Sequence, residues 1–126
     1  MIVLVDTSVW IRFLSNRAPY AARLEELLSR GEACGHDFVY GELLIGDLGG
    51  RKQLLADYHQ IHQAPVVPHD DVVAFVRSRR IHGRGIGWID AHLLASALVE
   101  RLALWTTDPR LRALAKELGA AYDDDA

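Results

Sequence analysis

The chain has 126 residues, of which 50% are hydrophobic and 25% are charged, a balance typical of one folded domain. Its single cysteine, Cys34, excludes an internal disulfide and any cysteine-based zinc site, and it favours a reducing cytoplasm. The formal net charge of −3 excludes nucleic-acid binding through bulk charge, so such binding needs a local basic patch. The apolar run 2–5 is too short for a signal peptide or membrane span, and we expect no membrane association.

Short apolar runs alternate with segments of helical periodicity along the chain. In the first half we expect strands at 3–5 and 33–35 and helices at 8–14, 20–28, 37–45 and 51–59. In the second half we expect a strand at 64–68, a helix starting at Asp70 or Asp71, a glycine-rich loop at 82–87, a helix at 88–101, a strand at 103–106, a helix at 109–118 and an edge strand at 120–122. The alternation predicts a single α/β domain with a mostly parallel sheet of four to five strands flanked by helices, and an acidic tail at 123–126.

Four acidic residues from distant points of this pattern are predicted to meet at one edge of the sheet. Asp6 follows the first strand and Asp108 follows the last, and the carboxyl ends of neighbouring parallel strands lie about 4.8 Å apart. Asp90 falls in the first turn of a helix that runs antiparallel to the strands, and Glu42 falls in the early half of another. Open α/β sheets bind their ligands at this edge.

Each acid also has a structural interpretation. Asp108 precedes Pro109 and is a good helix N-cap, Asp90 complements a helix dipole, and Asp6 is able to cap the first helix. Glu42 lies beyond the first turn amid apolar neighbours, where a carboxylate needs a partner or a proton. The coincidence of all four favours a functional site.

Converging carboxylates with no adjacent lysine or arginine in their motifs favour a divalent cation as the counter-charge. Their all-oxygen chemistry suits Mg²⁺, or Mn²⁺, better than zinc. Such sites activate water and stabilise charge on a transferring phosphoryl group. The hydroxyls of Ser8 and Thr106 flank the acids and are expected to orient a carboxylate or to bind a phosphate oxygen.

A local basic segment, 77–84, contains four arginines and no acid and leads towards Asp90. We expect Arg80, Arg84 and Arg110 to contact a phosphate-bearing substrate, and for Arg77 and Arg79 a solvated helix face is the alternative. The glycines at 83, 85 and 87 follow a helix, not a strand, so they do not match a dinucleotide-binding loop. The three tryptophans fall in apolar patterns that favour core packing over base stacking: Trp10, Trp88 and Trp105.

The four acid motifs together resemble the PIN-domain nucleases, and specifically the VapC-type toxins of bacterial toxin–antitoxin pairs. The matching segments are Val3-Leu4-Val5-Asp6-Thr7-Ser8-Val9-Trp10, Val39-Tyr40-Gly41-Glu42-Leu43, Trp88-Ile89-Asp90-Ala91-His92-Leu93-Leu94-Ala95-Ser96-Ala97 and Leu104-Trp105-Thr106-Thr107-Asp108. The family commonly has an aromatic residue a few positions after the last acid, and this chain has Leu111 there.

The resemblance implies a Mg²⁺-dependent endoribonuclease that hydrolyses RNA with a metal-activated water and leaves a 5′-phosphate and a 3′-hydroxyl. It carries the family's acidic quartet over to Asp6, Glu42, Asp90 and Asp108. We expect Asp6, Asp90 and Asp108 to hold the metal, and Asp108 and Glu42 to complete the site or orient the water. The resemblance also implies a VapB-type antitoxin partner and a homodimer, and exposed apolar residues on the first two helices are candidates for an antitoxin groove.

Two other classes of protein remain open at this stage. A metal-dependent phosphatase or phosphoacceptor domain typically has a second acid two residues after the first and a lysine at a later strand end. Here Ser8 takes the place of that acid, and the chain has only Lys52 and Lys116, neither at a predicted strand end. A catalytically inactive PIN scaffold is the other class, and the intact acid quartet argues against it.

Overall fold

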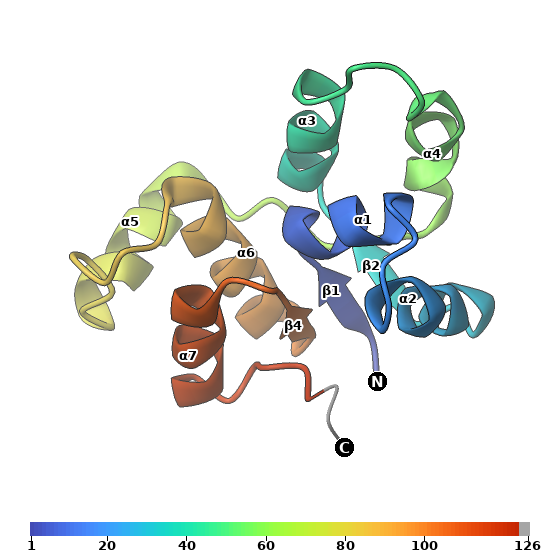
Figure 1. Ribbon diagram of the computed structural model, residues 1–126. Helices are drawn as coiled ribbons and strands as arrows, with labels where there is room; N and C mark the ends of the chain where they lie inside the picture. Colours follow the sequence, from blue (N-terminus) through green and yellow to red (C-terminus); the bar gives the residue numbers. More distant parts are fainter. Residues whose placement is uncertain (124–126) are drawn as a thin grey trace.

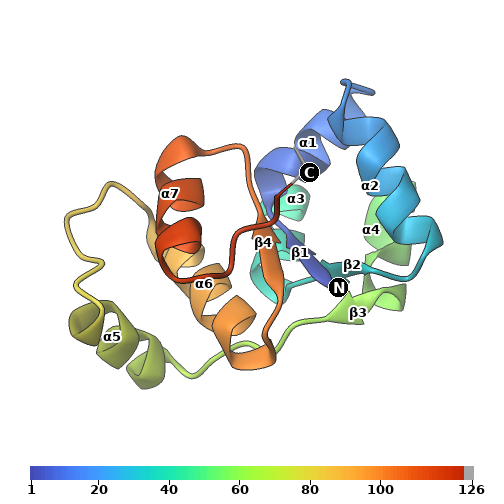
Figure 2. The ribbon, with the colours of Figure 1, turned by 90° about the horizontal axis from the view of Figure 1, so that it is seen from below.

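A parallel four-stranded sheet in the order β3-β2-β1-β4 forms the centre of the computed structural model, which describes residues 1–123. Its strands are β1 (Val3–Val5), β2 (Ala33–Gly35), β3 (His62–Gln63) and β4 (Ala103–Trp105). Every residue of β1 is apolar and buried, as a strand with neighbours on both edges and helices on both faces requires. The four strands follow one another across Figure 2, with helices on both sides.

Seven α-helices and one short 3₁₀ helix connect the strands within these residues. They are α1 (Thr7–Leu14), α2 (Tyr20–Ser29), α3 (Asp37–Ile45), α4 (Lys52–Asp57), the 3₁₀ helix η1 (Tyr58–Gln60), α5 (His69–Ser78), α6 (Trp88–Glu100) and α7 (Pro109–Glu117). The α/β architecture and the strands at 3–5 and 33–35 are therefore as predicted.

Four helix N-termini lie at the carboxyl edge of the sheet. Helices α1, α3 and α7 each begin within four residues of the end of a strand, because β1, β2 and β4 lead directly into them. Helix α6 leads into the start of β4, so it runs antiparallel to the strand and its N-terminus lies at the same edge as the others. Figure 1 shows these elements around the carboxyl end of β1.

The predicted strand at 64–68 is wrong, and β3 lies immediately before it. Ala64 still donates to Gly35 O at 2.8 Å, but Pro65 and Pro68 have no N–H group to donate to a sheet, so the pairing ends there. Residues 120–122 form a single parallel bridge, Ala121 to Leu104, and not a fifth strand. The predicted helix at 51–59 ends earlier as an α-helix and continues as η1.

The expectation of core packing is confirmed for two tryptophans and wrong for the third. Trp10 is 1% exposed and Trp105 is 2% exposed, whereas Trp88 is 43% exposed. Trp88 is the first residue of α6, and no element of residues 1–123 covers its outer side. Cys34 is buried and unpaired, in agreement with the absence of a disulfide.

No helix among residues 1–123 combines the length and the apolar character that crossing a membrane requires. Of the predicted acidic tail, 123–126, all but Asp123 lies outside the described residues.

Candidate active site

Asp6 follows β1 directly, and two hydroxyl groups hold its carboxylate. Ser8 Oγ and Thr106 Oγ1 each donate to Asp6 Oδ2 at 2.8 Å. The same hydroxyls accept hydrogen bonds from the backbone beyond β4, Ser8 Oγ from Thr107 N at 3.1 Å and Thr106 Oγ1 from Asp108 N at 3.1 Å. Each hydroxyl thus joins the end of β1 to the end of β4 and contacts a carboxylate of the predicted set.

The carboxylate of Asp6 does not cap helix α1. Asp6 occupies the N-cap position of α1, but its side chain makes no capping hydrogen bond. It is only 6% exposed, and both hydroxyls bind the same oxygen, Oδ2. Oδ1 therefore has no hydrogen-bond donor among residues 1–123 and remains able to bind a ligand.

Glu42 has a partner that sequence reasoning missed. Thr7 Oγ1 donates to Glu42 Oε1 at 2.6 Å and links the first turn of α1 to the middle of α3. This contact satisfies one oxygen of the carboxylate and leaves Oε2 without a donor in the described chain. In the sequence, only the position of Thr7 between Asp6 and Ser8 indicated a role in the site. The same three residues are equally typical of a helix start.

Asp90 and Asp108 combine the structural roles considered for them with positions at the same edge. Asp90 Oδ2 accepts from Gly87 N at 3.0 Å in the first turn of α6. Asp108 is the N-cap of α7 and its Oδ1 accepts from Arg110 N at 2.9 Å. In both residues the second carboxylate oxygen has no donor among residues 1–123.

The pKa of Asp90 responds to its burial and to the charges of the other three acids. Burial is the main reason why the pKa of Asp90 is raised, and the hydrogen bond from Gly87 opposes this rise. The negative charges of the other acids raise the pKa of Asp90 further, and they are those of Asp6, Asp108 and Glu42. Four segments far apart in the chain thus bring their carboxylates into electrostatic contact.

The donor set fits a hard divalent cation. Each of the four carboxylates keeps one oxygen free, and no lysine or arginine of the described chain forms an ion pair with any of them. Oxygen ligands and unbalanced negative charge are what Mg²⁺ and Mn²⁺ require. No three His, Cys, Asp or Glu side chains of residues 1–123 already close on a common point, so coordination requires the side chains to adjust.

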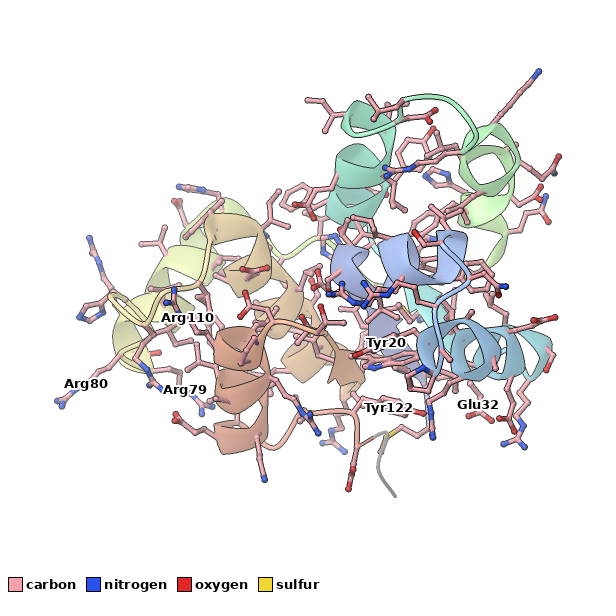
Figure 3. The ribbon with its side chains drawn as sticks, viewed as in Figure 1. Tyr20, Glu32, Arg79, Arg80, Arg110 and Tyr122 are labelled. Carbon is pink, nitrogen blue, oxygen red and sulfur yellow. The ribbon has the colours of Figure 1, made fainter. Side chains whose placement is uncertain are left out.

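The predicted substrate arginines lie near one another but differ in their contacts. Arg84 is paired with Glu117 of α7, Nη2 to Oε1 at 2.7 Å, in an exposed ion pair. Arg110 lies close to the loop before α6: a Cβ added to Gly85 of this loop would be 2.8 Å from Cδ of Arg110. Arg80, at the end of α5, extends away from the protein (Figure 3). The basic segment therefore borders α7: Arg84 pairs with Glu117 at its C-terminal end, away from Asp108, and Gly85 lies against Arg110 in its first turn.

Comparison with known proteins agrees with this geometry. A family model described as the PIN domain matches residues 3–117, a span that contains all four acids. The chain is 47% identical over 124 residues to proteins named Ribonuclease VapC32 from two strains of Mycobacterium tuberculosis, with 98% of this chain and 98% of each relative covered. On both counts the chain belongs to the PIN-domain family, among its VapC-type members.

Proposed function

We propose that the protein is a divalent-metal-dependent endoribonuclease and the toxin of a VapBC-type toxin–antitoxin pair. The observation that carries the proposal is the convergence of Asp6, Glu42, Asp90 and Asp108, each with a free carboxylate oxygen, at one sheet edge. The similarity to Ribonuclease VapC32 supports RNA as the substrate and a VapB-type antitoxin as the partner. A toxin directed at RNA acts in the cytoplasm, and the chain, with its single cysteine, needs no disulfide to fold.

Asp6, Asp90 and Asp108 are the residues that we assign to Mg²⁺, with Mn²⁺ as the alternative. The bound ion supplies positive charge and Lewis acidity at the phosphoryl group. The hydroxyls of Ser8 and Thr106 fix the Asp6 carboxylate from one side, so its free oxygen is presented in one orientation without further ordering.

Glu42 is the residue that we assign to the attacking water. Thr7 holds its Oε1, which leaves Oε2 to accept a proton from water. The oxygen of that water bonds to phosphorus while the bond from phosphorus to the 3′ oxygen breaks, and the 3′ oxygen takes a proton from solvent. The products are a 5′-phosphate and a 3′-hydroxyl, in agreement with the outcome that the family resemblance implies.

The arginines beside α7 provide the local positive charge that an RNA substrate needs in a protein of net charge −3. Arg80 forms no ion pair within residues 1–123, and Arg110 projects from the first turn of the helix that Asp108 caps. Arg84 is available to phosphate only if it leaves Glu117, and the exposure of that ion pair makes such an exchange inexpensive.

The antitoxin site that we propose is a hollow of about 390 Å³ between α1, α2 and α4. Its lining is mainly apolar and includes Trp10, Phe13, Leu14, Leu28, Leu54 and Ile61. This location agrees with the groove expected on the first two helices. An amphipathic antitoxin helix fits such a surface through its apolar side chains.

The homodimer surface that we propose is the aliphatic patch at the end of α3. Leu44 is 53% exposed, Ile45 is 89% exposed and Leu48 is fully exposed. Three large apolar side chains that are this exposed mark an interaction surface. Replacing Ile45 with Lys is expected to convert a dimer to a monomer in light scattering, and an unchanged mass would exclude this surface.

Cleavage of single-stranded RNA tests the proposed function. The wild-type protein is expected to cut RNA internally in Mg²⁺, to stop when EDTA is added, and to leave ends that a ligase requiring a 5′-phosphate accepts. The Asp6→Asn variant is expected to lose cleavage, while Asp71→Asn, which removes an exposed carboxylate on α5, retains it. Unchanged cleavage by Asp6→Asn, or release of phosphate from small phosphoesters without RNA cleavage, would contradict the proposal.

A further inference from the structure

Trp88 is an exposed aromatic side chain that the catalytic site does not use. It is the first residue of α6, two positions before Asp90, and it is 43% exposed. A tryptophan placed only for stability is normally buried, as Trp10 and Trp105 are. Its exposure beside the acidic edge requires an explanation other than core packing.

An aromatic row holds Trp88 in place across the first two turns of α6. The ring of Trp88 lies 5.1 Å from that of His92, and His92 lies 4.7 Å from Phe38 of α3. On the other side, Trp88 lies 5.3 Å from the ring of His69 at the start of α5. Trp88 is therefore supported from two sides while its remaining surface faces solvent.

Trp88 also forms one wall of a hollow of about 320 Å³ between α5 and the following loop. The other lining residues are Val73, Val76, Arg77 and His82. Val73, Val76 and Arg77 follow His69 at helical spacing, so a single face of α5 is turned towards the indole ring. The hollow is thus lined by one aromatic ring, two valines and two cationic or polar side chains.

The charge around this hollow suits an anionic chain. Residues 77–84 contain four arginines and no acid. Arg79, Arg80 and Arg110 lie on the side of the molecule where α5, its following loop and α7 meet (Figure 3). The acids of α5, Asp70 and Asp71, follow His69 in its first turn beside the indole ring, and Arg77 lies at the other end of α5, so the positive charge is at that end of the hollow.

The hollow is close enough to the four acids for one RNA strand to contact both. Trp88 and Asp90 belong to the first turn of α6 and project from nearly opposite faces of it, and a helix with its side chains is only ~10 Å across, so an RNA strand has to pass over the N-terminus of α6 to contact both. A few nucleotides of single-stranded RNA span this distance. The base of one nucleotide is thereby able to reach Trp88 while a neighbouring phosphate lies at the carboxylates.

We propose that Trp88 and the hollow beside it form a stacking site for an unpaired base of the RNA substrate, close to the cleaved phosphate. This inference rests on the proposed ribonuclease function and adds to it a residue that binds the substrate away from the four acids. Single-stranded RNA is recognised by stacking of splayed bases on aromatic side chains, whereas the bases of a duplex are unavailable for it. Arg77 and the arginines that follow it bind the phosphates on either side of that base.

Binding is measured in the Asp6→Asn background, so that the RNA stays intact. Trp10 and Trp105 are buried, so quenching of tryptophan fluorescence by added RNA reports on Trp88. We expect quenching by a single-stranded oligonucleotide and little quenching by the same sequence as a duplex. The Trp88→Phe variant is expected to lose the quenching while the emission of the other two tryptophans stays unchanged.

Cleavage kinetics in the otherwise wild-type protein give the second measurement. Trp88→Leu is expected to raise KM by about 5- to 150-fold, the range that a stacked base contributes, with a smaller change in kcat. The Trp88→Phe and Trp88→Tyr variants keep a stacking ring and are expected to stay within about 5-fold of wild type. Melting curves of all variants show whether Trp88→Leu is folded under the assay conditions.

Four outcomes would overturn the inference while the proposed function stands, and the first three concern quenching, KM and oligomeric mass. One is cleavage of RNA without fluorescence quenching, and another is an equal KM for the Trp88→Leu and Trp88→Phe variants. A third is a changed oligomeric mass of Trp88→Leu with an unaltered KM, which would assign this face to a second copy of the chain. Absence of RNA cleavage by the wild-type protein would instead refute the proposed function. Quenching of equal size by single-stranded and duplex RNA would also contradict base stacking.

Discussion

Replacing Thr106 with Val tests the hydrogen-bond frame that holds Asp6. The change keeps the shape of the side chain and removes the hydroxyl. It deletes the 2.8 Å hydrogen bond to the Asp6 carboxylate and leaves Asp108 N without its 3.1 Å acceptor. Ser8 still donates to Asp6, so the carboxylate loses one of its two donors.

The expected cost follows from the two lost hydrogen bonds. A hydrogen bond to a charged group contributes about 1.5–3 kcal/mol, and one between neutral groups contributes about 0.5–1.5 kcal/mol. We therefore expect Thr106→Val to lower the free energy of unfolding by about 2–4 kcal/mol. With an unfolding entropy of about 2.1 cal/mol/K per residue, this loss lowers the Tm of a 126-residue chain by about 8–15 °C.

The assay is urea unfolding and thermal melting in EDTA at neutral pH, with Thr106→Ser as the matched control. Thr106→Ser keeps the hydroxyl and removes one buried methyl group, for which we expect a loss of about 1 kcal/mol. A Val variant as stable as the Ser variant would refute the view that the hydroxyl frame holds the site together.

Three further predictions follow from the same structure. Burial and the neighbouring acids raise the pKa of Asp90, so its ionised form destabilises the fold at neutral pH. Asp90→Asn is therefore expected to raise the Tm in EDTA and to abolish the increase in Tm that Mg²⁺ gives. A lower Tm of this variant in EDTA would contradict the prediction. Burial lowers the pKa of His36 to about 4, so the folded state binds fewer protons than the unfolded state below pH 6.5. The free energy of unfolding should therefore fall by about 3 kcal/mol between pH 6.5 and about pH 4 in urea titrations. It should fall less in His36→Asn. The same pH dependence in the variant and the wild type would exclude His36 as the cause. Gly85→Ala and its control Gly83→Ala both place alanine at positive φ (+84° and +74°), but only a Cβ at Gly85 meets Arg110. Gly85→Ala should therefore weaken RNA binding at low salt more than Gly83→Ala does. Equal RNA affinities of the two variants would remove Arg110 from the RNA site.

The convergence of the acids was predictable because strand ends and helix starts leave clear marks in the sequence. The apolar run before Asp6 and the apolar run before Asp108 both read as buried strands, and β1 does pair with β4 in parallel. Asp90 and Asp108 also perform the helix-start roles that were weighed against function, so the two interpretations are compatible.

The remaining features depend on tertiary contacts that periodicity does not encode. Thr7 was missed because its bond to Glu42 joins residues 35 positions apart. The apolar segment 64–68 read as a strand, but its prolines left the pairing to His62 and Gln63, which are polar. Trp88 read as core because it starts an apolar helix, and only the fold shows that its outer face is uncovered.

Divalent-ion binding to the metal-stripped protein, followed by calorimetry or by thermal melting in increasing Mg²⁺ and Mn²⁺, tests the central claim most directly. The wild-type protein is expected to gain about 2.7 kcal/mol of stability at 100 times the dissociation constant, about 10 °C in Tm, and to cleave RNA over the same ion concentrations. Asp6→Asn is expected to lose both responses, and Asp71→Asn is expected to lose neither. Equal ion-dependent stabilisation of the wild type and Asp6→Asn would contradict the account.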